Sequence, residues 1–232
     1  MLPSGGLSQY PRPVRRLVNL LLLLAGVVSS DAARRTGHPN ILLLVAGDLG
    51  REWLGCYGGQ EIATPNIDRL ANGGTRFETC YASSHGTVSL NVLLTGRYPF
   101  RNGWMWHNDV PKWGPPYLDW NRERTFARHL QEAGYLTAYA GAWVLNDLEE
   151  QKNALANHGF EHRLAGANAE AAIGFMTVNQ ERPFLLLLKT GSKPQDYRLG
   201  VRSLDQTVGK LIKALEDLKL NRQTIVMFTS ES

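Results

Sequence analysis

The hydrophobic and polar positions of this chain fall into two alternating patterns. Short and nearly continuous apolar runs are typical of strands that are buried on both faces of a parallel sheet. Such runs occupy residues 40–46, 135–140, 183–188 and 223–229. Segments with apolar residues at helical spacing separate them, at residues 65–72, 87–94, 125–133, 165–179 and 201–218. The alternation predicts an α/β fold in one domain, with a mainly parallel sheet flanked by helices on both faces.

Turn-forming and capping residues indicate where these elements begin and end. Thr64 suits the N-cap of the first helix, Pro65 suits its first turn, and the glycine pair at residues 73–74 ends it. Residues 76–81 predict one more strand. Residues 98–123 hold four of the six tryptophans among Pro, Gly and Asn, which predicts an irregular but ordered loop with aromatic anchors.

The first 32 residues have the composition of an export signal. Three arginines form a basic region, and an apolar run follows over residues 17–28. That run is shorter than the ~20 apolar residues that a helix needs to cross a bilayer. We therefore predict a signal peptide at residues 1–32, an exported domain at residues 33–232 and no membrane span in the mature chain. An uncleaved N-terminal anchor is the alternative.

Net charge and cysteine content narrow the possible partners and chemistry. The formal net charge is +4, of which residues 1–32 contribute +2. The mature part has no long basic run, which argues against a nucleic-acid partner. Cys56 lies in a glycine-rich turn and Cys80 ends the predicted strand at 76–81. Two buried free thiols and a disulfide between them both stay open.

Three sequence blocks then occur in a specific order. They are HPNILLLVAGDLG at residues 38–50, TPNIDRLA at residues 64–71 and LLTGRYP at residues 93–99. In this order and spacing they resemble the N-terminal part of the sulfatases, in the alkaline-phosphatase superfamily. The tryptophan-rich loop somewhat resembles that of heparan N-sulfatases. The resemblance implies an alkaline-phosphatase-like fold that lacks the family's C-terminal subdomain.

The resemblance also implies a reaction, and the residues that would perform it are mostly replaced. Sulfatases hydrolyse sulfate esters with a formylglycine made from a Cys or Ser, in a C/S-x-P/A-x-R motif. Counting back from the LLTGR block places Gly86 at the nucleophile position, Val88 at the proline position and Leu90 at the arginine position. Thr87 is the one candidate for a replacement nucleophile, as in related superfamily members. We favour the interpretation that Thr87 caps the helix that follows.

The groups that would bind a metal ion and the sulfate are also altered. The family's paired metal aspartates correspond to Gly47 and Asp48, and a later acidic ligand corresponds to Glu231. Asp48 and Glu231 are therefore the candidates for a residual Ca²⁺ site, and no other cofactor is expected. The Gly-Lys-Trp-His element corresponds to residues 141–144, where both the Lys and the His are replaced by apolar residues.

Candidate anion-binding residues remain near these positions. They are His85 beside the nucleophile position, His107 in the tryptophan-rich loop and Lys193 after the strand at 183–188. Lys189 and Lys193 are the lysines nearest to the expected sulfate site, and we expect both to lie on the surface. We predict a catalytically inactive sulfatase homologue that binds a sulfated glycan or another anionic small molecule. One alternative is an inactive homologue whose tryptophans are core anchors and which binds no ligand. The others are a sulfuric ester hydrolase, a metal-dependent phosphoesterase that uses Thr87, and a truncated gene product without function.

Overall fold

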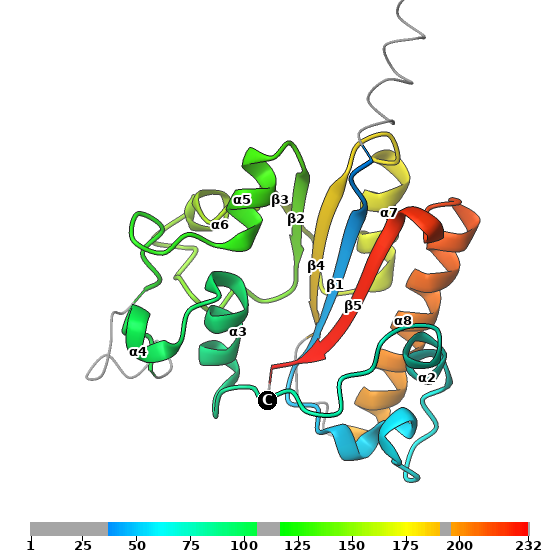
Figure 1. Cartoon of the computed structure of the whole chain (residues 1–232). Helices are drawn as coiled ribbons and strands as arrows, with labels where there is room; N and C mark the ends of the chain where they lie inside the picture. The colour runs from blue at the N-terminus through cyan, green and yellow to red at the C-terminus, as the bar shows by residue number, and fades with distance from the viewer. Residues whose placement is uncertain (1–36, 106–116, 191–195, 232) are drawn as a thin grey trace, which may run out of the picture. The chain divides into compact units, whose positions relative to one another are not determined.

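Five parallel strands form the centre of the fold (Figure 1). The strands are β1 (Asn40–Ala46), β2 (Leu136–Ala140), β3 (His162–Leu164), β4 (Phe184–Thr190) and β5 (Thr224–Ser230). Their order in the sheet is β3-β2-β4-β1-β5, and each neighbouring pair runs parallel. This confirms the predicted α/β class with a mainly parallel sheet.

The computed structural model describes residues 37–105, 117–190 and 196–231. These residues belong to the unit Pro39–Ser232, apart from the first two. The predictions made for residues 1–32, His107 and Lys193 lie outside the described residues. Within them, no helix is long and apolar enough to cross a membrane.

Helices cover both faces of the sheet, and the alternation of strand side chains explains why. Leu42, Leu44 and Ala46 of β1 belong to one buried cluster, whereas Leu43 and Val45 belong to another. The first cluster includes residues of α2 (Pro65–Asn72), α7 (Ala169–Val178) and α8 (Tyr197–Asp217). The second includes residues of α3 (Gly86–Thr95), α5 (Phe126–Glu132) and α6 (Ala154–Asn157). The sheet is therefore the middle of three layers.

Five of these helices were expected from the apolar spacing, and three short elements were not. The elements that the sequence pattern did not predict are β3, α6 and the four-residue helix α4 (Pro99–Asn102). Each has at most four residues. Such short segments contain too few residues to show a strand or helix period.

The strand predicted at residues 76–81 is wrong. The segment has no regular secondary structure, and Phe77 and Tyr81 are 69% and 91% exposed. Side chains, rather than a neighbouring strand, bind its backbone: Tyr57 donates a hydrogen bond to the Phe77 carbonyl, and Arg51 donates one to the Glu78 carbonyl. The segment is not part of the sheet, whose five strands are β3, β2, β4, β1 and β5 in that order.

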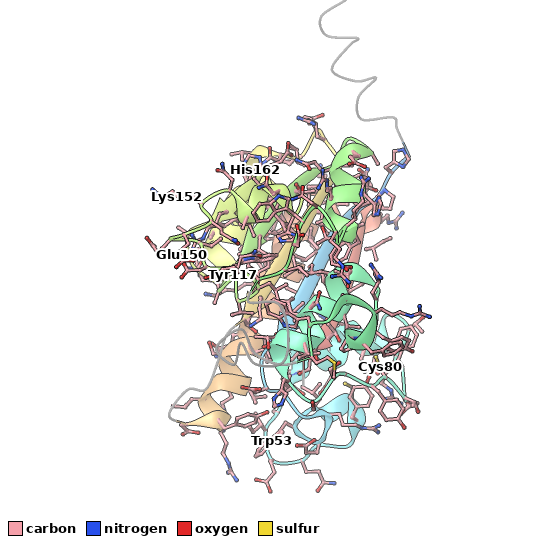
Figure 2. All side chains as sticks on the ribbon, turned by 90° about the vertical axis from the view of Figure 1, so that its left-hand side faces the viewer. Trp53, Cys80, Tyr117, Glu150, Lys152 and His162 are labelled. Atoms are coloured by element: carbon pink, nitrogen blue, oxygen red, sulfur yellow. The ribbon has the colours of Figure 1, made fainter. Side chains whose placement is uncertain are left out.

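The structure shows where the two cysteines lie and that they are not bonded to each other. Cys80 lies on this segment, at the surface between α2 and α3 (Figure 2), and its side chain is exposed. Cys56 is partly buried, and both thiols are free in the structure. The expectation of two buried thiols is therefore wrong for Cys80, because the strand that would have buried it does not form.

The start of α2 is stabilised from a distant part of the chain. Thr64 occupies the N-cap position as expected, but its hydroxyl donates to Asp68 and accepts from the Gly55 amide. The first amides of α2 are bound instead by Asp205 of α8, which is 4% exposed. Its Oδ1 accepts hydrogen bonds from the amides of Asn66 and Ile67, each at 2.9 Å. Its Oδ2 accepts one from the Asn66 side chain at 2.7 Å. A helix in one segment is thus capped by a helix about 140 residues away.

His158 forms a buried polar junction on the other side of the sheet. Its Nε2 lies 3.2 Å from the Leu118 carbonyl oxygen and 3.1 Å from Asn146 Oδ1. Both partners are acceptors, so Nε2 carries the proton and Nδ1 is unprotonated. Burial, helped by the nearby charge of Arg128, lowers the pKa of His158 to about 4, against the opposing effects of the Leu118 hydrogen bond and the Asp119 charge.

This junction predicts a loss of stability in acid. Between about pH 6.5 and pH 4 the unfolded chain binds a proton at this histidine and the folded chain does not, so stability falls as the pH falls through that window. The loss should reach ~3 kcal/mol. Urea unfolding at a series of pH values measures it. His158→Gln should flatten the profile, whereas His129→Gln, at an exposed position, should leave it unchanged. An unchanged profile in His158→Gln would contradict this account.

Candidate functional site

The carboxyl ends of three strands meet the start of α3 at one edge of the sheet, at the lower side of Figure 1. The register pairs Val45 of β1 with Lys189 of β4 and with Thr229 of β5. The residues that follow these strands therefore lie side by side. In open parallel sheets this edge is where ligands bind. The sequence-predicted positions Gly86, Asp48 and Glu231 all lie there.

A buried ion pair occupies the centre of this edge. Lys189 Nζ lies 3.0 Å from Glu231 Oε1, and the two side chains are 8% and 9% exposed. The Glu231 amide donates a hydrogen bond to the Ala46 carbonyl at 3.0 Å, which fixes the chain beside β1. The expected surface position of Lys189 is wrong. It is buried because it lies on the same face of β4 as Leu185 and Leu187, and the helices of the second buried cluster cover that face.

Glu231 fills the space next to the nucleophile position. A Cβ atom placed on Gly86 would lie 2.8 Å from Glu231 Oε1 and 2.9 Å from its Cδ. Contacts below 3.0 Å are too short for any real side chain, so a residue larger than glycine requires Glu231 to move. Gly86 is also the first residue of α3, whose N-cap is His85. A carboxylate beside the start of a helix is electrostatically favourable.

Thr87 lies inside α3 rather than at its cap. The N-cap is His85, in an extended conformation, so the prediction that Thr87 caps the helix is wrong. The capping position moves because α3 starts at Gly86, one residue earlier than the apolar pattern indicated. His85 does not cap α3 with its side chain.

The acidic residues do not match the needs of a calcium ion. Ca²⁺ takes six to eight oxygen ligands. The Glu231 carboxylate faces the Lys189 ammonium at 3.0 Å, and this cation repels a metal ion. The Asp48 side chain is exposed, and its backbone is held by Tyr197, whose hydroxyl donates to the Asp48 carbonyl. Within residues 37–105, 117–190 and 196–231, no group of three or more His, Cys, Asp or Glu side chains could hold a metal ion.

The element at residues 141–144 closes one side of the edge with apolar groups. Gly141 has φ +121°, and a Cβ there would lie 2.2 Å from the Lys189 carbonyl oxygen, so only glycine fits. Trp143 packs edge-on against Tyr139, with ring centroids 5.2 Å apart. Tyr139 donates a hydrogen bond to the Ala142 carbonyl. Burial raises the pKa of Tyr139, and the Glu231 charge raises it further, so this phenol stays neutral.

The described part of the tryptophan-rich loop is a structural anchor. Trp104 is 1% exposed, and its amide donates to Asn102 Oδ1 at 2.9 Å. Arg97 forms a 2.8 Å ion pair with the buried Glu123, which joins the end of α3 to the segment before α5. These contacts support the expected aromatic anchoring. His107 and the tryptophans at 106 and 113 lie outside the described residues.

Comparison with known proteins places these features in a family. The sequence model described as "Sulfatase" matches residues 39–183, which is more than half of the chain. The chain belongs to the sulfatase family. Its fold is alkaline-phosphatase-like, and it resembles the N-terminal part of the family's proteins.

Known sulfatases share the sequence over different lengths. Steryl-sulfatase of Homo sapiens is 39% identical over 151 residues, which cover 62% of this chain and 25% of that protein. N-acetylgalactosamine-6-sulfatase of Canis lupus familiaris is 28% identical over an alignment of 280 positions, which covers 91% of this chain and 53% of that protein. The chain thus spans about a quarter to a half of the length of these relatives.

Solved sulfatase structures share the fold. The PsFucS1 sulfatase from Pseudoalteromonas sp. has a TM-score of 0.66 at 22% identity, over 95% of this chain and 59% of that chain. Ps i-CgsB in complex with k-i-k-neocarrahexaose has a TM-score of 0.70 at 24% identity, over 84% of this chain and 58% of that chain.

The sequence analysis identified the individual residues at this edge of the sheet, but it did not predict the ion pair between two of them. It named Lys189 and Glu231 for different tasks, one on the surface and one as a metal ligand. The structure pairs them. The signal that could have found the pair is a lysine that closes a fully apolar strand, because such a lysine must meet a buried anion.

Proposed function

We propose that this chain is a non-catalytic member of the sulfatase family. One observation carries the proposal: the nucleophile position is Gly86, and the place of its missing side chain is filled by the Glu231 carboxylate. Residue 86 therefore has no reactive atom, and a side chain there would first have to displace the Glu231 carboxylate. A negative charge at this place would also repel a sulfate ester.

The groups that would stabilise a transferred sulfuryl group are also missing or engaged. Ala142 and Val144 supply no charge at the positions of the family's Lys and His. Lys189 is bound to Glu231. Loss of one preorganised charge-stabilising group typically lowers a catalysed rate by ~10²–10³-fold. Loss of the nucleophile together with several such groups supports complete inactivity.

The proposal predicts no hydrolysis of p-nitrophenyl sulfate or p-nitrophenyl phosphate, with or without added Ca²⁺. Thr87→Ala, which removes the one candidate for a replacement nucleophile, should give the same background rate as the wild-type protein. Absorbance of released p-nitrophenol measures both. A wild-type rate that exceeds background and falls at least tenfold in Thr87→Ala would refute the proposal and favour the hydrolase or phosphoesterase alternative.

We further propose that the ligand of this protein is a sulfated glycan. Two related proteins support this ligand class: one is an N-acetylglucosamine-6-O-sulfatase of Bacteroides thetaiotaomicron, and the other is Ps i-CgsB, whose structure holds k-i-k-neocarrahexaose. The sulfate groups of the glycan would bind at His107 and Lys193, which lie outside the described residues, and not at residue 86, where Glu231 fills the space. Calorimetry with a sulfated and a desulfated form of one oligosaccharide tests this. Equal binding of both forms, or none of either, would remove this ligand class.

Export is proposed on the composition of the leader. The domain would then consist of residues 33–232, after removal of residues 1–32 as a signal peptide. The test is N-terminal sequencing of the protein recovered outside the cytoplasm of its host. A mature protein that begins near residue 33 supports export, and one that keeps residues 1–32 contradicts cleavage.

A further inference from the structure

The buried ion pair between Lys189 and Glu231 does not have the arrangement expected of a pair that only stabilises the fold. Glu231 Oε1 binds Lys189, but Oε2 has no hydrogen-bond partner among the described residues, although it is buried. A carboxylate that leaves water with half of its acceptors unpaired loses more solvation than one ion pair returns. Hydrophobic side chains of similar size would stabilise such a place at least as well.

The position of the carboxylate indicates a different role. Its Oε1 lies 2.8 Å from the position that a Cβ on Gly86, the first residue of the ten-residue helix α3, would take. The start of a helix presents unpaired amides and a partial positive charge, which together attract anions. The Lys189 ammonium adds a full positive charge, on a side chain that is only 8% exposed. Glu231 thus lies where these two positive groups would together hold an anion.

We propose that Glu231 is an internal anion, which fills an anion site formed by Lys189 and the start of α3 and keeps external anions out. The inference rests on the proposed function, since a site filled in this way cannot receive a sulfate ester. It extends that function, because it states that the capacity to bind a small oxyanion is still built into the chain and is masked by one side chain.

The proposal predicts the effect of removing the side chain. In Glu231→Ala the ammonium of Lys189 loses its counter-ion and the space in front of Gly86 becomes free. An external oxyanion such as sulfate should then bind there. In Glu231→Gln the charge is removed but the space stays filled, so this variant is the matched control for volume. Glu231→Ala combined with Lys189→Met removes the cation and is the control for charge.

The experiment is thermal unfolding of the full chain and these three variants, titrated with sodium sulfate against sodium chloride of equal ionic strength. The chloride series separates binding from ionic strength, and the wild-type series corrects for the general stabilisation by sulfate. The apparent dissociation constant of Glu231→Ala for sulfate should be ~10–100-fold lower than that of the wild-type protein, as expected for a charge-assisted contact. Glu231→Gln and the double variant should behave like the wild-type protein.

Each outcome decides the question. Equal sulfate binding by the wild-type protein and Glu231→Ala, or tight binding that persists without Lys189, would overturn the proposal. If Glu231→Ala unfolds without a cooperative transition, recovery of that transition by sulfate supports the proposal and failure to recover it overturns the proposal. Turnover of p-nitrophenyl sulfate by the wild-type protein, measured in parallel, would refute the proposed lack of catalysis without touching the internal-anion role.

Discussion

Lys189→Met is expected to lower the free energy of unfolding by ~3–5 kcal/mol, because it leaves the Glu231 carboxylate buried and without its counter-ion. Methionine keeps most of the length and the apolar part of the lysine side chain, so the loss reports the charge rather than a cavity. Urea or guanidinium unfolding of the variant and the wild-type protein measures it.

The control for this prediction is the double variant Lys189→Met with Glu231→Gln. A neutral amide costs less to bury than an unpaired carboxylate, so the double variant should recover at least half of the stability lost in Lys189→Met. Additive losses from the two single changes would show that the residues do not interact, and would contradict the buried pair.

Asp205→Ala is expected to lower the free energy of unfolding by a similar ~3–5 kcal/mol. The change removes a buried carboxylate that accepts three hydrogen bonds at the start of α2, two of them from backbone amides. Each charge-assisted bond contributes ~1.5–3 kcal/mol, and the amides left behind are partly buried without an acceptor. The same unfolding measurement applies.

Two matched variants show whether the cap is responsible. Asp217→Ala, on the same helix, removes only an exposed pair with Lys213 and should change stability by less than about 0.5 kcal/mol. Asp205→Asn keeps an oxygen acceptor and should fall between the two. If Asp205→Ala is as stable as Asp217→Ala, the attachment of α2 to α8 through this carboxylate is wrong.

The main elements of the fold could be predicted from the sequence because their patterns are long. The apolar run that became β1 covers seven residues and was placed with its correct ends. The end of β4 extended two residues beyond the expected run, to Lys189 and Thr190. A lysine interrupts an apolar pattern, so a pattern based on hydrophobicity stops before it.

Other features depend on contacts that sequence order does not reveal. Thr64 has the right type for a cap, but Asp205 binds the helix start, and their separation hides the link. The apolar residues at 76–81 suggested a strand, but an apolar pattern does not show whether the backbone of a segment pairs with another strand. The pairing of Lys189 with Glu231 was missed for the same reason. Lys189 lies in β4 and Glu231 follows β5, two strands that are far apart in the chain, and only the folded sheet brings them together.

The sequence predicted which catalytic groups the candidate site lacks, but it did not predict which side chains lie in their place. Glycine at residue 86 was evident from the spacing to the LLTGR block. That a carboxylate would fill the space beside it was not, because Glu231 was assigned a metal that its ammonium partner excludes.

The central claim is that the sulfatase fold of this chain holds no working sulfatase site. The most direct test is the amount of free sulfate released from 6-O-sulfated N-acetylglucosamine and N-acetylgalactosamine, measured by ion chromatography after long incubation with the wild-type protein and Ca²⁺. We predict release equal to that of buffer alone at every protein concentration. Release that rises in proportion to the protein concentration would contradict the account.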